Sequence, residues 1–376
     1  MEQQRHALIT GSGSYIPTLK VTNEDFLSHT FYGSDGVRLQ KSSEEIIRQF
    51  GLITGIRERR YLTDELVASD MAHFAAKDAL AAAAIDPETL DYIIVAHNFG
   101  DIRAENRRSE QVPSLAARVK HHLGIINPQT ICYDLPFGCA GWLQAMIQAD
   151  GYIRSGEATQ ILLIGAETLS RICDPHDRDS MLYADGAGAV VVSASSAHDA
   201  AGILTHLTRS YGGELAYLLQ MGRSSDPAYP EDTLFLKMQG RKLYEQALKF
   251  VPLLISDCIA KAGLSISDID QVLIHQANHK MDEAILKQLY LLYGLKEVPD
   301  HIMPMTISWL GNSSVATLPT LYDLLSKGEI DHHTLTPGRT IVFASVGAGL
   351  NMNAVIYKIP QSGKSEPQSD ERHCAG

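Results

Sequence analysis

Paired cysteine spacings and long apolar runs are both missing from this sequence of 376 residues. Its five cysteines show no CxxC spacing, so the sequence predicts neither a zinc site nor a disulfide framework. They are Cys132, Cys139, Cys173, Cys258 and Cys374. The apolar stretch near the N-terminus is too short for a secretory signal, and no later run is long enough to span a bilayer. The sequence therefore predicts a cytoplasmic protein that does not act in a membrane and binds no metal through cysteine.

Positive charge is also in short supply. The chain has 32 Lys and Arg residues against 44 Asp and Glu, which gives a net charge of −12 at pH 7. Nucleic-acid binding requires clustered cations, so this balance argues against a nucleic-acid partner. Two basic clusters can each be interpreted as a solvated surface or as a docking patch for an acidic carrier protein. They comprise Arg57, Arg59 and Arg60, and Arg103, Arg107 and Arg108.

Helical and strand-like patterns alternate along the chain, which predicts an α/β architecture. Short apolar runs typical of buried strands are separated by stretches with helical periodicity. Helices are expected at residues 69–84 and 243–262, and strands at residues 91–98, 131–137, 160–165, 188–194, 271–275 and 340–345.

One stretch in the first part of the chain is echoed in the second. Residues 84–95 (AIDPETLDYIIV) and 263–274 (GLSISDIDQVLI) both run from a helix end through an acidic turn into a strand. We therefore expect two similar halves in one compact body, residues 1–200 and 201–360, joined near residues 195–205. The polar segment 361–376 is expected to be disordered.

Cys139 stands in the segment with the strongest chemical signal. An apolar strand runs into Gly138-Cys139-Ala140-Gly141, and a helix with an apolar stripe follows as far as Gly156. The cysteine is therefore expected on a tight turn at a helix N-terminus, where the positive end of the helix dipole favours the reactive thiolate. The alternative for such a residue is a buried cysteine packed beside a turn.

Two segments of the second half could supply partners for this cysteine. His275 follows an apolar strand, at the end where open α/β sheets bind ligands. Asn312 lies in a small polar loop that opens a helix. Taken alone, the histidine is typical of a structural residue, and the loop is typical of a turn and helix N-cap.

Gly11-Ser12-Gly13 follows a short apolar run, as the start of a dinucleotide-binding loop would. The third glycine of that motif is missing, and Pro17 stands where the helix should continue. The sequence therefore argues against a nucleotide site.

Taken together, these segments resemble the ketoacyl-acyl carrier protein synthase III family of the thiolase superfamily. The resemblance covers residues 7–358. Its catalytic motifs match as Gly138-Cys139-Ala140-Gly141, His275-Gln276-Ala277-Asn278 and Gly311-Asn312-Ser313-Ser314. Other matching segments are residues 10–17 (TGSGSYIP), 54–59 (TGIRER), 173–178 (CDPHDR) and 185–189 (DGAGA). The resemblance implies a thiolase fold with five α-β-α-β-α layers, and a homodimer.

The resemblance also implies roles for individual residues. Cys139 would attack a thioester and hold the acyl group, and His275 and Asn312 would donate hydrogen bonds to the carbonyl of the second substrate. The backbone N–H groups of Cys139 and Ala348, the latter beside Gly347, would stabilise the oxyanion. No metal or redox cofactor is implied, and the substrates are acyl thioesters on acyl carrier protein or coenzyme A.

The sequence departs from the family at positions that face the carrier. Members that use a coenzyme A primer have a Trp and an Arg just before the segment at 54–59, and the Trp is absent from residues 44–53. A substrate bound to acyl carrier protein is therefore expected. Arg178 and Asn278 match the carrier side of the family, Lys280 replaces an Arg, Lys287 fits a basic position, and Glu245 stands where the family can show Lys.

A second departure concerns the acyl pocket. Residues 99–111 form a longer and more charged loop than in the simple fatty-acid members, and it would lie near the partner subunit's pocket. Val112 stands before Pro113, where the family often has a Phe that closes the pocket. The smaller side chain predicts acyl chains longer than acetyl.

These departures favour a ketosynthase outside primary fatty-acid synthesis. The hypothesis is the dialkylresorcinol-forming type, which joins a 3-oxoacyl and a 2,3-unsaturated acyl thioester into a cyclohexanedione. The alternatives are the initiating enzyme, which condenses an acyl primer with malonyl-carrier, an acyltransferase to a hydroxyl or amine, and a non-catalytic acyl-binding or scaffold protein. The intact Asn312 argues against the acyltransferase, and the intact Cys139 argues against the scaffold.

Overall fold

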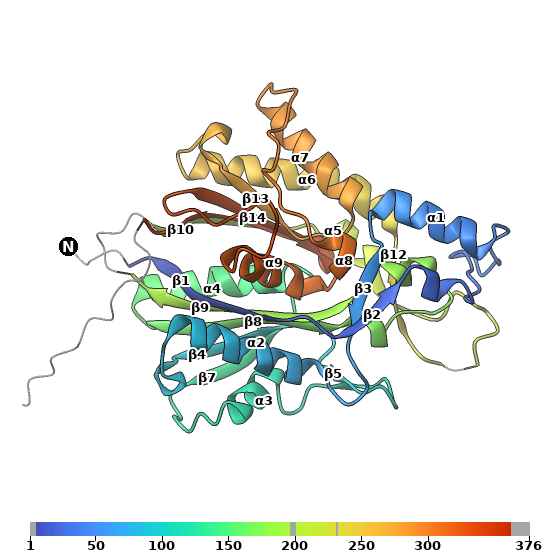
Figure 1. The fold of residues 1–376 in the computed structure, drawn as a ribbon, viewed down its shortest axis with the longest axis horizontal. Coiled ribbons are helices and arrows are strands. Elements are labelled where there is room, and N and C mark those ends of the chain that lie inside the picture. The colour runs from blue at the N-terminus through green and yellow to red at the C-terminus, as the bar shows by residue number, and fades with distance from the viewer. Residues whose placement is uncertain (1–4, 196–200, 231, 362–376) are drawn as a thin grey trace, which may run out of the picture.

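Two β-sheets lie face to face within layers of helices. The computed structural model describes residues 5–195, 201–230 and 232–361. Helices α2 and α3 cover the outer face of the first sheet, α4 and α9 lie between the sheets, and α6 and α7 cover the second sheet (Figure 1). The layers alternate as α-β-α-β-α, which confirms the expected architecture.

Where the sequence predicted the bounds of a helix or strand in these layers, the element begins and ends within a few residues of them. The layer helices are α2 (Ala68–Ala83), α3 (Leu115–His122), α4 (Gly141–Ser155), α6 (Gly240–Lys261), α7 (His279–Leu292) and α9 (Thr317–Ser326). The first sheet comprises β1 (Ala7–Tyr15), β4 (Tyr92–Ala96), β7 (Ile131–Leu135), β8 (Gln160–Thr168) and β9 (Asp185–Ala194). The second comprises β10 (Gly202–Ser210), β13 (Gln271–Ile274), β14 (Thr340–Gly347) and β15 (Asn351–Lys358).

Three further helices and three short strand pairs lie outside these layers among the described residues. The remaining helices are α1 (Ser43–Thr54), α5 (Gly212–Leu215) and α8 (Ile307–Leu310). The short strand pairs are β2 (Leu19–Thr22) with β3 (Glu58–Tyr61), β5 (Asp101–Ile102) with β6 (Ser109–Glu110), and β11 (Leu219–Gly222) with β12 (Phe235–Met238). Within the described residues, no helix has the length and apolar character that a membrane crossing requires.

The order of the first sheet is β1-β9-β8-β4-β7, and that of the second is β10-β15-β14-β13. The second sheet repeats the first four places of the first sheet, with the same parallel and antiparallel pairings, and has no strand that corresponds to β7 among the described residues. The outermost place of the second sheet is taken by the segment at Ile302, whose carbonyl accepts a hydrogen bond from Val272 N–H at 2.9 Å. The echo seen in the sequence is repeated in structure, because α2 and α6 each lead through a single 3-10 turn into β4 and β13. The two halves are therefore built alike. The expected join includes residues 196–200 and the expected tail includes residues 362–376, which lie outside the described residues.

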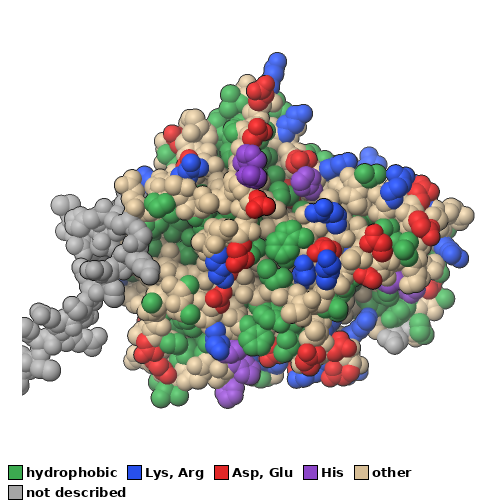
Figure 2. Space-filling view, in the orientation of Figure 1, with side chains coloured by type: hydrophobic (Ala, Val, Ile, Leu, Met, Phe, Trp, Pro, Cys, Tyr) green, Lys and Arg blue, Asp and Glu red, His purple; other side chains and the backbone are tan. Residues whose placement is uncertain are grey.

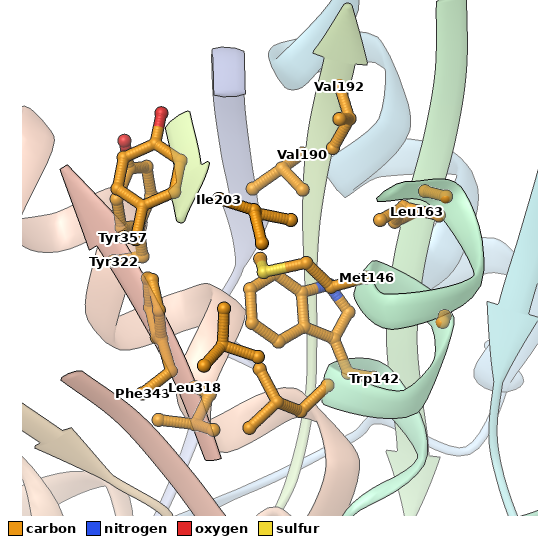
Figure 3. Packing of buried hydrophobic residues seen from close by; sticks show 14 of the residues in the cluster. Trp142, Met146, Leu163, Val190, Val192, Ile203, Leu318, Tyr322, Phe343 and Tyr357 are labelled. Atoms are coloured by element: carbon orange, nitrogen blue, oxygen red, sulfur yellow. The ribbon is translucent and has the colours of Figure 1, made fainter. Parts of the chain in front are cut away.

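The core between the sheets fixes α4 in place. Trp142 and Met146 project from α4 among side chains of both sheets (Figure 3). The rings of Trp142 and Phe343, the latter on β14, have centroids 6.0 Å apart. Because close packing around so large a buried side chain resists movement, the turn that precedes α4 is held against both halves of the protein.

The glycines that mimic a nucleotide loop serve helix packing instead. A Cβ added at Gly13 would lie 2.4 Å from the backbone nitrogen of Ala79, and one at Gly11 would lie 2.4 Å from that of Ala83. Both contacts are with α2, so β1 needs residues without side chains here. The motif therefore marks a close approach of strand and helix.

Two sequence expectations are wrong. Strand β7 was expected to be buried, but it forms the edge of its sheet, and Ile131 is 49% exposed. Arg59 was expected in a solvated or docking face, but it is fully buried. Its guanidinium donates to Asn23 Oδ1 at 2.6 Å and to the carbonyls of Val21 and Met181. Neither result follows from local composition, because each depends on which distant segments cover the residue.

Candidate active site

Cys139 lies on the tight turn that the sequence predicts between β7 and α4. Gly138 holds a φ of +60°, which a side chain would disfavour, and Gly141 N–H donates to its carbonyl at 3.1 Å. Helix α4 then runs to Ser155 and ends at Gly156, whose φ is +79°. Cys139 is partly accessible, as a residue that meets a substrate must be.

Residues of the second half of the protein hold this turn through hydrogen bonds and close backbone contacts. Ser345 Oγ donates to the carbonyl of Cys139 at 3.1 Å, and Asn353 Nδ2 donates to that of Ala140 at 3.2 Å. A Cβ added at Gly347 would lie 2.3 Å from Cys139 N. A Cβ added at Gly138 would lie 2.5 Å from the backbone nitrogen of Ala348. The structure thus brings together the two backbone amides that the sequence assigned to the oxyanion site.

Asn312 is linked to Cys139 through Ser314, a residue of the same loop. It lies between α8 and α9, is 6% exposed, and its Oδ1 accepts from Ser314 N–H at 2.9 Å. Ser314 Oγ in turn donates to Cys139 Sγ at 3.3 Å. Because Oδ1 is engaged within the loop, the amide keeps its Nδ2 as the group able to donate elsewhere.

His275 directly follows β13 and joins the same region through β14. Its backbone N–H donates to Ala344 O at 2.8 Å, and the next residue of β14, Ser345, contacts Cys139. The imidazole is 2% exposed, and its Nδ1 has no hydrogen-bond partner among the described residues. Burial lowers the pKa of His275 to about 4, so the imidazole is neutral near pH 7.

The buried His275 should make the fold sensitive to acid. Its pKa in the folded state lies below the ordinary value of 6.5, so the unfolded chain binds more protons between those values, and stability falls as pH drops from about 6.5 to about 4. Between pH 7 and pH 4.5 this linkage should remove about 2 kcal/mol from the free energy of unfolding. Denaturant titrations of the wild type and of His275→Gln at both pH values check this. The variant should lose less stability on acidification, and parallel losses in the two proteins would contradict the linkage.

The protonation state of Cys139 differs from the sequence expectation. Loss of water around the thiol raises the pKa of Cys139 to about 11, although the hydrogen bond from Ser314 acts in the opposite direction. The helix N-terminus therefore does not hold the resting side chain as a thiolate. Desolvation is the largest influence on this pKa, because the sulfur lies among protein groups from both halves.

Three residues to which the sequence analysis gave no role lie near the sulfur: Ser314, Asn98 and Glu167. Glu167 lies near the end of β8, is fully buried, and accepts from Asn98 N–H and Nδ2 at 3.1 and 2.7 Å. Burial raises the pKa of Glu167 to about 7. Polar residues at the carboxyl ends of neighbouring strands were the signal that could have identified Asn98 and Glu167.

Most of the residues assigned to the carrier or to the acyl pocket are exposed. Arg178 and Lys280 are exposed, and Asn278 caps α7 by accepting from Met281 N–H at 3.2 Å. Val112 is 90% exposed and precedes Pro113 through a cis peptide bond. Lys287 is also exposed, and Glu245 pairs with Arg241 at 3.1 Å. Basic and acidic side chains are interspersed over the face shown in Figure 2.

Other candidate sites are sparse. Among the described residues, no group of three or more His, Cys, Asp or Glu side chains is arranged to hold a metal ion. A polar surface cavity of about 420 Å³ opens beside Asp270, Gln271, His301 and His332, and it includes none of Cys139, His275 and Asn312.

Two family models and a curated relative match this chain. The family model for 3-oxoacyl-[acyl-carrier-protein (ACP)] synthase III matches residues 133–212, and the model for its C-terminal part matches residues 259–359. The beta-ketoacyl-[acyl-carrier-protein] synthase III of Ehrlichia canis (strain Jake) is 32% identical over 357 residues, which cover 94% of this chain and all of that protein. The chain belongs to the 3-oxoacyl-[acyl-carrier-protein] synthase III family. It is accordingly an acyltransferase of the condensing type.

Solved structures of the synthase III family share the whole fold. The Aquifex aeolicus VF5 enzyme matches with a TM-score of 0.75 and 29% identity, covering 94% of this chain and 99% of its own. The Pseudomonas aeruginosa PAO1 enzyme matches with a TM-score of 0.77 and 27% identity, covering 96% of this chain and 100% of its own. This synthase III therefore has the thiolase fold that its sequence predicts.

Proposed function

We propose that this synthase III joins two acyl thioesters through an acyl group held on Cys139. The observation that supports this most directly is the meeting of three chain segments at one sulfur. The turn that carries Cys139 contacts Gly347 and Ser345 of β14, and its thiol receives a hydrogen bond from Ser314 in the loop of Asn312. Such an arrangement offers a nucleophile, amide donors and polar groups around one reacting carbon.

In the first step, Cys139 is acylated. Its sulfur attacks the thioester carbonyl, a C–S bond forms, and the N–H groups of Cys139 and Ala348 stabilise the negative oxygen. The bond to the carrier's sulfur then breaks, and the carrier thiol leaves with the proton that Cys139 gave up. No metal or redox cofactor takes part, because every bond change is a polar acyl transfer.

In the second step, His275 and Asn312 act on the other substrate. His275 as a neutral imidazole and Asn312 through Nδ2 donate hydrogen bonds to the carbonyl oxygen of the second thioester, so that its α-carbon becomes an enolate-like nucleophile. A carboxylate in this place would repel the developing charge. The C–H bond at the α-carbon breaks, the α-carbon attacks the acyl carbonyl, and a C–C bond forms. The C–S bond then breaks, so that the Cys139 sulfur leaves and takes up the released proton.

The substrates proposed are a 3-oxoacyl and a 2,3-unsaturated acyl thioester, whose union leads to a cyclohexanedione precursor of a dialkylresorcinol. The absence of Trp from residues 44–53 and the small Val112 support carrier-bound chains longer than acetyl. The alternative function is that of an initiating synthase III, which condenses a primer with malonyl-carrier. The named relative from Ehrlichia canis, matched over 94% of the chain, favours that reading.

The proposal includes acyl carrier protein as the donor, with Arg178, Asn278 and Lys280 on the carrier side, and a cytoplasmic homodimer. Strand β7 supports the dimer, because no strand of the described residues pairs with its outer edge, on which Ile131 is 49% exposed. Val112, 90% exposed, would be covered by the partner and shape its acyl pocket. Sedimentation equilibrium tests this part, and a monomer at micromolar concentration would contradict it.

Intact-mass spectrometry after incubation with acyl thioesters of increasing chain length tests the first step. We expect an acyl adduct on Cys139 that forms faster with longer chains than with acetyl, and none on Cys139→Ala, which serves as the blank. A strict preference for acetyl would contradict the pocket assignment. Absence of any adduct would favour a non-catalytic acyl-binding protein.

Product formation separates the two condensing reactions. Radiolabelled malonyl-carrier should release no labelled CO₂ in the resorcinol-type reaction, and the paired 3-oxoacyl and unsaturated thioesters should give a cyclohexanedione. Decarboxylative elongation of a primer would instead identify the initiating enzyme.

A further inference from the structure

A chain of side-chain hydrogen bonds runs from a buried carboxylate to the Cys139 sulfur. Glu167 Oε2 accepts from Asn98 Nδ2 at 2.7 Å. The same Nδ2 donates to Ser314 Oγ at 3.4 Å, and Ser314 Oγ donates to Cys139 Sγ at 3.3 Å. The four residues come from β8, the end of β4, the loop before α9 and the turn before α4. No single sequence motif contains them.

The direction of the first two hydrogen bonds follows from the chemistry of Asn98. An amide NH₂ group can only donate, and one of its two hydrogens is directed at Glu167 Oε2, which also accepts from Asn98 N–H at 3.1 Å. The other hydrogen is directed at Ser314 Oγ, which occupies a lone pair of that hydroxyl. The hydroxyl keeps its single hydrogen for donation, and in the structure Ser314 Oγ donates to Cys139 Sγ at 3.3 Å.

Ser314 is held in this position by an unusual backbone conformation. Its φ is +54°, which residues other than glycine seldom adopt, and its N–H is bonded to Asn312 Oδ1 at 2.9 Å. Such a conformation persists only where the surroundings impose it, and strained residues concentrate at functional sites. The strain here aims the hydroxyl toward Cys139.

We propose that Asn98 is a positioning residue that, anchored by Glu167, directs the Ser314 hydroxyl at the Cys139 sulfur. A hydroxyl that points at sulfur stabilises the thiolate over the thiol, and it remains to orient the sulfur when the acyl group leaves. The inference rests on the proposed role of Cys139 as the acylated nucleophile.

The two ends of this series of hydrogen bonds have opposite effects on the pKa of Cys139. The hydrogen bond from Ser314 lowers the pKa of Cys139, whereas the negative charge of Glu167 raises it. Glu167 itself faces His97 and Asp185, and Tyr183 also lies close to the sulfur. His97 is in turn paired with Asp134 at 2.9 Å. Removing the hydroxyl and removing the carboxylate charge should therefore move the reactivity of Cys139 in different directions.

The reactivity of Cys139 can be measured without any acyl substrate. The protein is alkylated with iodoacetamide between pH 7 and 9, and the rate at which Cys139 is modified is followed by peptide mass spectrometry. Ser314→Gly removes the hydroxyl and suits a φ of +54°, so this variant should fold. We expect it to be alkylated about threefold more slowly, because a rise of about one unit in thiol pKa is half offset by greater thiolate nucleophilicity. Glu167→Gln keeps an acceptor for Asn98 and removes the charge, so it should react faster than the wild type.

A double-mutant cycle isolates the role of Asn98. Asn98→Ala should slow alkylation about threefold in the wild type and have no effect in the Ser314→Gly background, because it acts through that hydroxyl. An equal effect of Asn98→Ala in both backgrounds, or slower alkylation of Glu167→Gln, would overturn the proposal. Ser12→Ala removes a buried hydroxyl on β1 that is bonded to Asp323 at 2.9 Å, and it controls for loss of a buried hydrogen bond elsewhere in the protein.

Failure of this inference is distinguishable from failure of the proposed function. If Cys139 takes up no acyl group in the mass assay, the alkylation cycle still reports whether Asn98 acts through Ser314. If the cycle shows no coupling while the wild type is acylated, only the positioning role is lost.

Discussion

Replacing Gly347 by alanine is expected to slow acylation of Cys139 by about 10²–10³-fold, the loss seen when one oxyanion donor is removed. The added Cβ would lie 2.3 Å from the backbone nitrogen of Cys139 and 3.0 Å from that of Ala140. Both contacts are with backbone, so no side chain can move aside, and the turn and the β14 corner must separate. The amides of Cys139 and Ala348 would then no longer face one oxygen. The rate of adduct formation by intact mass measures the effect.

Gly151 on α4 offers a matched control for the Gly347→Ala substitution. A Cβ at Gly151 would meet no atom within 4 Å, so Gly151→Ala should keep wild-type acylation and stabilise the helix slightly. Thermal melts of both variants separate lost geometry from lost folding. Wild-type acylation by folded Gly347→Ala would refute the close contact as a functional constraint.

The second large effect concerns the step after acylation. With acyl-Cys139 formed beforehand, His275→Ala and Asn312→Asp should each slow carbon–carbon bond formation by about 10²–10³-fold, because each removes a donor to the developing enolate oxygen. Neither change should undo the local fold. The imidazole Nδ1 has no partner among the described residues, and an aspartate keeps the oxygen that accepts from Ser314 N–H.

Single-turnover decay of the preformed adduct after addition of the second thioester measures this step. The adduct should persist in both variants and disappear in the wild type. Adduct decay at the wild-type rate in either variant would remove that residue from the condensation step.

The sequence was a good guide to whatever depends on neighbouring residues. Helix α4 follows from the apolar stripe between Gly141 and Gly156, and the turn before it follows from Gly138. The echo between residues 84–95 and 263–274 predicted that the two halves share one architecture, and the four strands of the second sheet repeat the order of four strands in the first. Local periodicity suffices for such features, because backbone geometry and the burial of one face act over a few residues.

Contacts between segments that are distant in the sequence could not be predicted from local periodicity. Arg59 looked like surface charge, yet Val21, Asn23 and Met181 enclose it. The edge position of β7 was missed for the same reason, since an apolar run does not reveal whether a neighbour covers it.

By itself, the sequence determined the chemistry available: a cysteine at a helix start, a histidine at a strand end, an asparagine in a polar loop, and their membership of the synthase III family. Only the tertiary structure decided how that chemistry is held. It placed Ser314 on Cys139, 175 positions away in the chain, and it left the thiol protonated and His275 neutral. The physical reason is that protonation states follow from desolvation and nearby charge, which depend on the packing of both halves around one sulfur.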